Sequence, residues 1–492
     1  MFICILLLIS SAILIKPLSN LDELWNYNFA SNIAKGNLPY KDFNMVQNPL
    51  LPILCGFILR VFGNELIVMR LIAIFLNSII IFLVYKILKL LKINNYFIYL
   101  SLAGICFIYY NYFCLDYNFA VLLIALLTLY LEMKSLHKDD KIIIFNLKKD
   151  FLLGMLVGTS ILLKQTTGLF LALIFIFYKL LIVRGKEQWK TVGKIIITRT
   201  IGILIPVVLL FLYLIVNNIW SDFLDYTIYG IKTFSNKIDY INLIKVYELP
   251  VKILSILVPI TIIYMYFLSV VQETKTNQQK NTFILFVYSV GCFIVTFPIS
   301  DSIHFLIGSM PAIISLIYII WTGLKKIKLK KEILNLAREF IKAFSILSIA
   351  YLMILALILI GTYFNNYSNF SNLKHFKLVP SELDNRIIKV DNYILEQNSK
   401  GNKVYILDAT ACIYMIPLDK YNKNYDMFLK GNLGSRGEKG QIEALQNEKN
   451  AIILILNEEY PRNWQNPEGV RKYIIENWNK TGEISGFDIY EK

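Results

Sequence analysis

Residues 20–52 read NLDELWNYNFASNIAKGNLPYKDFNMVQNPLLP and form a polar, aromatic-rich stretch between two apolar runs near the start of the chain. This stretch carries three carboxylates, Asp22, Glu23 and Asp42. Acidic residues beside a bilayer are candidates for a functional site, because charge close to hydrocarbon is costly and is retained where it is used. The alternative is a solvated loop whose acids stay in water because nothing draws them inward. The residues of this stretch alone leave both interpretations open.

The composition of the whole chain indicates a membrane protein. Of its 492 residues, 56% are hydrophobic and only 17% are charged, and the mean hydropathy is +0.54, which is above the range of soluble globular domains. The formal net charge of +15 comes from lysines in short clusters between apolar runs, the positive-inside pattern of membrane proteins. We therefore expect membrane lipid, and no nucleic acid, as a partner. The six cysteines show no paired spacing for zinc or for a disulfide framework.

Eleven apolar runs are candidate transmembrane helices and predict an all-helical polytopic bundle. A further apolar segment, residues 50–62, is too short to cross, contains Pro52 and follows Pro49. It is therefore predicted to lie on the membrane surface or to re-enter it. The candidate spans are residues 1–16, 65–85, 96–114, 118–132, 150–164, 167–183, 195–217, 250–270, 282–299, 304–323 and 341–363.

The lysine clusters predict how the spans are oriented. With the N-terminus in the cytoplasm, the inner loops hold most of the lysines, and the outer loops hold fewer. The lysine-rich loops fall at residues 86–92, 134–149, 184–194, 275–280 and 325–338. The N-terminus is therefore predicted to be cytoplasmic, and an odd number of spans places the chain from about residue 364 onward outside the membrane.

This topology brings polar residues from distant parts of the sequence to the outer face of the bilayer. The alternative is that each short outer loop simply needs some polar residue. Arg70 lies about a turn and a half into the second span, toward the same face, and a cation at that depth needs an anionic partner such as a lipid phosphate or a loop carboxylate. The residues predicted at outer span ends or in outer loops are Asp22, Glu23, Asp42, Asp116, Lys164, Gln165, Asp301 and His304.

The last 129 residues, 364–492, differ in composition from the spans, because they are charged and contain only short apolar runs. Helical and strand patterns alternate there, which predicts a small extracytoplasmic α/β domain. The glycine-rich residues 431–440 lack the spacing of a phosphate loop and are expected to be flexible. The predicted elements are helices at 382–397 and 468–478 and buried strands at 404–409 and 451–457. We thus expect two domains, a transmembrane domain over residues 1–363 with its first outer loop at 17–64, and a C-terminal domain over 364–492.

The stretch DELWNYNFASNIAKGNLPYKDF (22–43), followed by QNPLLP (47–52), resembles the first outer loop of the GT-C superfamily of polytopic glycosyltransferases. The similar proteins include bacterial relatives of the protein O-mannosyltransferases and the aminoarabinose transferases. KQTTG (164–168) and DSIH (301–304) are similar to span-end motifs of the dolichyl-phosphate-mannose-mannosyltransferase-like group. The sequence departs from the aminoarabinose transferases at residues 47–49, where that group has an acidic and a basic residue before its prolines.

The resemblance implies a GT-C-like membrane enzyme of about eleven spans that moves a hexosyl or pentosyl group from a polyprenyl-phosphate donor to a cell-envelope acceptor (lipid, glycan or protein). Such a transfer needs a base for the acceptor and positive charge at the departing phosphate. Asp22 matches the first-loop aspartate of the family and is the candidate base, and it is also a candidate helix N-cap. Glu23 and Asp42 complete the catalytic candidates. Together with Asp22 they are the candidates for holding a divalent cation, Mg or Mn.

The remaining candidates are assigned to the substrates. Arg70, Lys164 and His304 are the candidate partners of the donor phosphate. The aromatic candidates could stack on a sugar or anchor the protein at the membrane interface. The candidate contacts to sugar or acceptor are Trp25, Tyr27, Tyr40, Gln47, Asp116, Gln165 and Asp301.

Two other classes of protein share parts of this pattern. A transporter or flippase of lipid-linked saccharides would also have many spans, but should show charged residues in mid-span and repeats between its halves. Here the charges concentrate toward one face, and Arg199 is the main other exception inside a span. A non-catalytic anchoring protein would need neither the acidic cluster nor its alignment with Lys164 and His304. The enzyme interpretation therefore leads.

Overall fold

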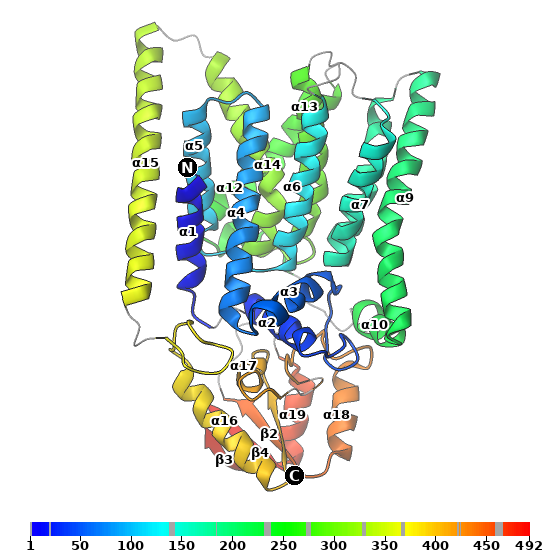
Figure 1. The fold of residues 1–492 in the computed structure, drawn as a ribbon, viewed down its shortest axis with the longest axis vertical. Coiled ribbons are helices and arrows are strands. Elements are labelled where there is room, and N and C mark those ends of the chain that lie inside the picture. Colours follow the sequence, from blue (N-terminus) through cyan, green and yellow to red (C-terminus); the bar gives the residue numbers. More distant parts are fainter. Residues whose placement is uncertain are drawn as a thin grey trace. The chain divides into compact units, whose positions relative to one another are not determined.

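The computed structural model describes residues 2–18, 21–136, 143–183, 185–230, 238–271, 277–326, 331–365, 370–420, 423, 425–457 and 466–492. The chain forms two compact units, each assembled from three separate segments (Figure 1). Unit 1 comprises Met1–Ile13, Ala73–Leu210 and Lys237–Tyr363, and unit 2 comprises Leu14–Ile72, Phe211–Asn236 and Phe364–Lys492. Parts of the predicted lysine-rich loops, at 137–142, 184, 272–276 and 327–330, lie outside the described residues.

Every apolar run that the sequence marks as a candidate span contains a helix, so the predicted polytopic bundle is confirmed. Among the described residues, α4, α6, α9, α12, α14 and α15 are long and apolar enough to cross a membrane, and the other helices are shorter. The chain is a multi-pass membrane protein. The eleven helices are α1 (Phe2–Leu14), α4 (Leu66–Leu90), α5 (Asn95–Tyr109), α6 (Tyr117–Leu136), α7 (Leu147–Leu163), α8 (Gln165–Phe177), α9 (Lys186–Val216), α12 (Leu249–Tyr266), α13 (Asn277–Phe293), α14 (Ser302–Lys326) and α15 (Lys331–Asn365).

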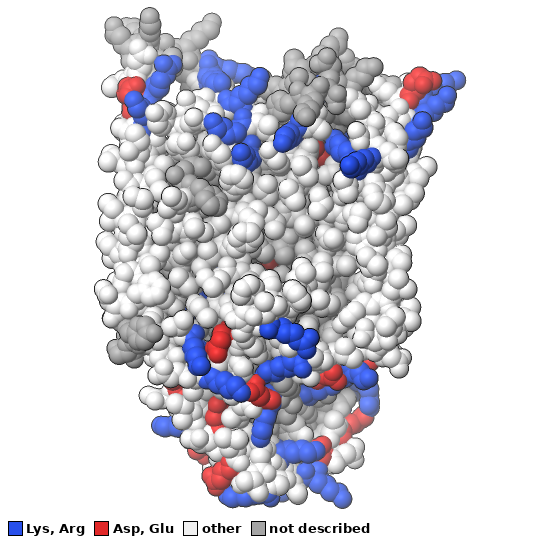
Figure 2. Space-filling view, viewed as in Figure 1, with Lys and Arg blue, Asp and Glu red and all other residues white. Residues whose placement is uncertain are grey.

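Charged side chains are nearly absent from the middle of the visible face of the unit 1 helices (Figure 2). Lysines and arginines gather at one end of these helices, at the upper edge of that view. Exposed lysines include Lys89 in the last turn of α4, Lys92 just after that helix, and Lys186 and Lys190 in the first turns of α9. An apolar belt with basic residues at one end is the surface expected of a bundle that spans a bilayer.

Close packing and buried charge together hold α7 against α9 inside unit 1. A Cβ atom added at Gly154 of α7 would lie 2.5 Å from the backbone oxygen of Arg199 in α9, so only glycine permits this approach. Arg199 is fully buried, and its Nε donates to Asp150 Oδ1 of α7 at 2.9 Å. Its guanidinium also pairs with Glu132 of α6 and lies 4.0 Å from the centre of the Phe175 ring of α8. Four helices therefore meet at one paired cation.

Unit 2 contains two helices from the first outer loop, α2 (Leu21–Ala34) and α3 (Leu50–Phe62), and the α/β segment at the C-terminus. The predicted short helix at residues 50–62 is α3, with Pro49 at its N-cap. Residues 211–230 join this unit through the end of α9, α10 (Trp220–Leu224) and a π-helical turn at Asp225–Tyr229.

The C-terminal segment forms a four-stranded sheet in the order β1-β2-β4-β3. The parallel strands β1 and β2 are the two predicted strands, and β4 pairs antiparallel with both β2 and β3. The β3–β4 hairpin is not predicted by the sequence analysis, although Ser485-Gly486, both at positive φ, mark its turn. The elements are α16 (Asp384–Ser399), β1 (Lys403–Leu407), α17 (Cys412–Met415), α18 (Gly437–Asn447), β2 (Ala451–Leu456), α19 (Glu468–Asn477), β3 (Asn479–Ile484) and β4 (Phe487–Glu491).

A core of apolar side chains holds this sheet to its helices. Leu407 and Ile453 from the parallel strands pack with Ile474 of α19 and Phe428, all of them fully buried. The expectation of a flexible stretch at residues 431–440 is wrong in its second half, because α18 begins at Gly437. The predicted small α/β architecture of the segment is confirmed.

Hydrogen bonds tie the first outer loop to the C-terminal segment within unit 2. Trp25 Nε1 of α2 donates to the backbone oxygen of Ala409, just after β1, at 3.1 Å. Asn44 Nδ2 donates to the backbone oxygen of Asn432 at 2.8 Å. Lys35 of the loop also forms an ion pair with Asp419. The first loop and the C-terminal segment, which the sequence analysis assigns to different domains, thus belong to one compact unit.

Candidate active site

Asp22, the candidate base, lies in the first turn of α2 and is partly buried. The sequence analysis considers it as the N-cap, but α2 begins at Leu21, so Asp22 is a helical residue of the first turn. Its backbone oxygen accepts a hydrogen bond from Asn26 Nδ2 at 2.8 Å. A carboxylate in this position interacts favourably with the positive end of the helix dipole. The hydrogen bond from Asn26 thus fixes the backbone at Asp22.

Glu23 and Arg70 form a buried ion pair within unit 2. Arg70 Nε donates to Glu23 Oε1 at 3.0 Å and Nη2 donates to Glu23 Oε2 at 2.9 Å. Arg70 Nη1 also donates to the backbone oxygen of Leu14 at 3.0 Å. The side chains of Arg70 and Glu23 are 0% and 2% exposed. Of the two partners that the sequence leaves open for Arg70, the loop carboxylate is the one found, and the pair fixes α2 to the start of α4.

The aromatic candidates of the loop are anchors of unit 2. Tyr27 is fully buried, and its hydroxyl is 3.1 Å from the backbone oxygens of both Asn64 and His375. Tyr40 is fully buried as well, and its hydroxyl donates to the backbone oxygen of Gln47 at 2.7 Å. Burial raises the pKa of Tyr40 well above its usual value. Neither ring has an exposed face, so we do not assign a sugar-stacking role to Tyr27 or Tyr40.

Trp25 and Gln47 also have structural contacts in unit 2. The indole of Trp25 is partly buried and holds the turn after β1 through Ala409. Gln47 is buried, and its Nε2 donates to Asn26 Oδ1 of α2 at 3.2 Å. The bond from Gln47 to α2 closes residues 35–47 into a compact loop.

Asp42 is exposed and closes a turn of the first loop. Its Oδ2 accepts from the backbone N–H of Leu38 at 2.6 Å, and its own N–H donates to the Leu38 oxygen at 2.9 Å. Both oxygens of Glu23 bond to Arg70, so Asp22, Glu23 and Asp42 do not form the predicted Mg or Mn site. In the part of the chain that the structure describes, no three His, Cys, Asp or Glu side chains are arranged to hold a metal ion.

In unit 1, the candidates Asp116 and Lys164 are linked through a residue that the sequence analysis did not single out. Lys164 Nζ donates to Asn118 Oδ1 at 2.7 Å, and Asn118 Nδ2 donates to Asp116 Oδ2 at 2.8 Å. Asp116 is 1% exposed. Burial raises the pKa of its carboxyl, while Lys164 and the bonds from Asn118 act in the opposite direction.

Lys164 occupies the break between α7 and α8, where its backbone is extended with φ −148° and ψ 114°. Gln165 is the first residue of α8. The two helices double back closely, because a Cβ added at Gly168 would lie 2.4 Å from the backbone of Ser160 and Ile161. The KQTTG motif therefore encodes a tight helical hairpin with a lysine at its tip.

Asp301 and His304 form a helix cap at the start of α14. Asp301 Oδ1 accepts from the backbone N–H of His304 at 2.8 Å and lies 2.9 Å from His304 Nδ1. This is the pattern of an N-cap side chain that bonds to the third residue of its helix. The DSIH motif therefore has a local structural explanation, and the histidine ring is directed to its own cap.

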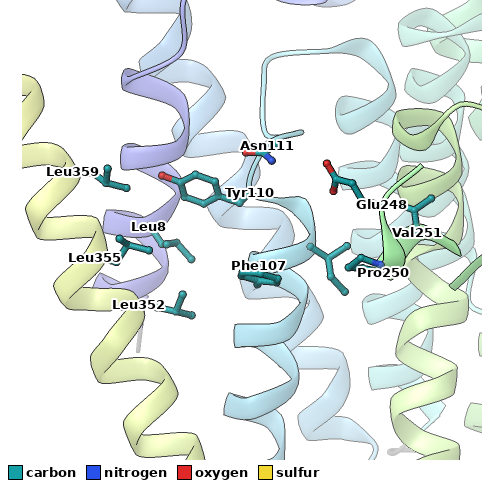
Figure 3. Close-up of a pocket in the computed structure, with 11 residues that line it drawn as sticks. Leu8, Phe107, Tyr110, Asn111, Glu248, Pro250, Val251, Leu352, Leu355 and Leu359 are labelled. Atoms are coloured by element: carbon teal, nitrogen blue, oxygen red, sulfur yellow. The ribbon is translucent and has the colours of Figure 1, made fainter. Parts of the chain in front are cut away.

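Figure 3 shows a cavity of about 200 Å³ inside unit 1, among α1, α5, the start of α12 and α15. Its walls are mainly apolar. Leu8 of α1 and Leu355 of α15 lie on one side, Val251 of α12 lies on the other, and Phe107 of α5 lies between them. Tyr110, Asn111 and Glu248 supply its polar groups. None of the predicted site residues lines this cavity.

The sequence analysis missed the partners of Arg199 as well as Asn118. Glu132 and Asp150 are each 2% exposed and belong to helices that are distant from Arg199 in sequence. Glu132 and Asp150 could have been predicted as its partners, because an arginine buried inside the membrane requires acidic partners. Asn118 could have been predicted as a partner of Asp116, because it follows that acid by two residues at the start of a helix.

The structure is similar to two solved structures of one protein. The crystal structure of ArnT from Cupriavidus metallidurans in the apo state matches with a TM-score of 0.58 and 11% identity, and covers 99% of this chain and 96% of that chain. The structure of the same protein bound to undecaprenyl phosphate matches with a TM-score of 0.54, 10% identity and the same coverage. At such low identity the likeness concerns the fold alone, and it agrees with the predicted polytopic helical bundle that carries a small C-terminal α/β segment.

A looser match is the Archaeoglobus fulgidus oligosaccharyltransferase in complex with Zn and sulfate. Its TM-score is 0.39 at 12% identity, over 80% of this chain and 55% of that chain. No protein-family model matches the sequence, and no curated protein does.

Proposed function

We propose that the protein is a membrane glycosyltransferase that takes a sugar from a polyprenyl-phosphate donor and transfers it to a cell-envelope acceptor on the outer face. The observation that carries this proposal is the likeness to ArnT, which extends over 99% of the chain and includes a structure bound to undecaprenyl phosphate. The first-loop aspartate expected of this fold is present in α2. The proposed transferred group is a hexosyl or pentosyl group.

In the proposed reaction, Asp22 accepts the proton of the acceptor hydroxyl or amine as that group attacks the anomeric carbon of the sugar. The new bond forms at this carbon while its bond to the phosphate oxygen breaks, and the electron pair leaves with polyprenyl phosphate. Positive charge near the departing phosphate stabilises the transition state. Lys164 is the proposed source of that charge. Arg70 and His304 are withdrawn from this role, because Glu23 and Asp301 bind them.

Replacement of Lys164 by methionine should reduce transfer from a polyprenyl-phosphate sugar by about tenfold to a hundredfold, the usual worth of a hydrogen bond to a charged group. The loss should come mainly through weaker use of the donor. The measurement is transfer at several donor concentrations in reconstituted vesicles. Lys186→Met, at an exposed position in the first turn of α9, is the matched control and should leave transfer unchanged. Normal donor use by the Lys164 variant would exclude this lysine as the phosphate partner.

The proposed orientation places the N-terminus in the cytoplasm and residues 364–492 outside. It is supported by the lysine-rich end of unit 1 and by α15, which is long enough to cross a bilayer. Reporter domains fused after residue 335 and after residue 370 should therefore report opposite sides of the membrane. Reporters on the same side would show that α15 does not cross.

A further inference from the structure

Asn118 lies between Asp116 and Lys164, the proposed partner of the donor phosphate, and its side chain bonds to both. It is 3% exposed and belongs to the first turn of α6. Its orientation follows from the chemistry of its neighbours, because a lysine ammonium only donates hydrogen bonds and the Asp116 Oδ2 atom accepts here. The amide oxygen must therefore face Lys164 and the amide nitrogen must face Asp116, as the distances of 2.7 and 2.8 Å show.

The two ends of this link come from different helices. Asp116 and Asn118 are at the start of α6, and Lys164 is at the tip of the α7–α8 hairpin, 46 residues away from Asn118 in sequence. The ring of Tyr117 lies 5.1 Å from Lys164 Nζ and lines another side of the ammonium. A lysine side chain that makes no contacts samples many rotamers and loses this freedom when it is ordered. The amide bond and the ring therefore reduce the ordering that Lys164 must undergo when it binds an anion.

Asp116 is itself held in place. The backbone N–H groups of Tyr117 and Asn118 bond to its carboxyl in addition to the Asn118 amide. Its other oxygen, Oδ1, has no hydrogen-bond partner among the described residues. The loop before it is fixed by α4, because Asn77 Nδ2 donates to the backbone oxygen of Cys114 at 3.0 Å. Asn118 is therefore attached to a rigid support, and Lys164 is attached to Asn118.

We propose that Asn118 is a positioning residue that holds the ammonium of Lys164 in place for the phosphate group of a polyprenyl-phosphate donor. This inference rests on the function proposed above. A neutral amide holds the lysine through a hydrogen bond without adding a negative charge beside the phosphate. An aspartate at the same position would have the same shape but would attract the ammonium to itself and repel the phosphate.

The test is the affinity of the full-length protein in nanodiscs for polyprenyl phosphate, compared with the uncharged polyprenol of the same length. Asn118→Leu should weaken binding of polyprenyl phosphate about tenfold and leave binding of polyprenol unchanged. In a Lys164→Met background the same substitution should have no further effect, because the lysine that it positions is gone. A role in folding alone would not produce this dependence on the phosphate and on Lys164.

Asn118→Asp provides a second variant that preserves shape if the leucine variant does not fold. It should weaken binding of polyprenyl phosphate at least as much as Asn118→Leu. Its control is Asn146→Asp, which makes the same change of charge at the N-cap of α7, where aspartate caps as well as asparagine. That control should bind like the original protein.

Two results would overturn the inference. One is unchanged phosphate affinity in folded Asn118 variants while Lys164→Met loses it, which would leave the proposed function standing without a role for Asn118. The other is an original protein that binds polyprenyl phosphate no better than polyprenol, which would remove the proposed function and this inference together.

Discussion

Sugar transfer should fall by about two to four orders of magnitude when Asp22 is replaced by asparagine, the scale expected for loss of a general base. The substitution preserves the size of the side chain but removes its ability to take a proton. It also removes a carboxylate from the first turn of α2, which should cost only about 0.3–1 kcal/mol of stability. The measurement is transfer in vesicles supplied with a polyprenyl-phosphate sugar, with thermal melting recorded in parallel.

Asp384→Asn is the matched control for this substitution. Asp384 is also in the first turn of a helix of unit 2, α16, so its replacement makes the same change to a helix dipole. It should melt like the Asp22 variant and transfer sugar at the original rate. A folded Asp22→Asn protein with normal transfer would remove Asp22 as the base and leave it with a helix-stabilising role.

Replacement of Glu23 by glutamine should reduce the free energy of unfolding by about 3–5 kcal/mol, because it leaves the buried guanidinium of Arg70 without its counter-charge. Transfer per folded molecule should change far less than in the Asp22 variant. Thermal melting in detergent measures the first effect, and transfer normalised to folded protein measures the second. A stable Glu23→Gln protein with little transfer would instead show that Glu23 takes part in catalysis.

The double variant Glu23→Leu, Arg70→Met distinguishes a role of this ion pair in stability from a role of Arg70 in donor binding. Removing both charges should restore most of the stability lost in Glu23→Gln, because apolar side chains of similar volume often replace a buried ion pair without loss. If Arg70 contacts only Glu23 and the backbone of Leu14, donor affinity should also be retained. A stable double variant that no longer uses the donor would show that Arg70 binds the phosphate.

The helices of this protein could be predicted from sequence because hydropathy is a local property. Long apolar runs define the spans, and Pro49 and Pro52 mark the short helix α3. The role of an aromatic side chain could not be predicted in the same way. Tyr27 and Tyr40 are aromatic residues of a type that can stack on sugars. Their burial, however, depends on contacts with segments far away in the chain, such as residues 375 and 223.

The candidate site shows the same limit. Polarity at outer span ends predicted that Asp116 and Lys164 share one face of the bilayer, but not the Asn118 amide that joins them. Depth in the membrane predicted that Arg70 needs an anion, but sequence could not choose between a lipid and Glu23. Such choices depend on tertiary geometry, because a hydrogen bond requires a specific distance and direction between two atoms.

The bond between Trp25 and Ala409 joins residues that are 384 positions apart. At a synthesis rate of about 5–20 residues per second, roughly 20–80 seconds separate the appearance of these two residues on the ribosome. During that interval the first outer loop lacks the partners that complete its fold. The helix α2 of a nascent chain inserted in the membrane would therefore reach its final packing only as synthesis ends, and premature termination anywhere before β1 should yield an inserted but inactive protein.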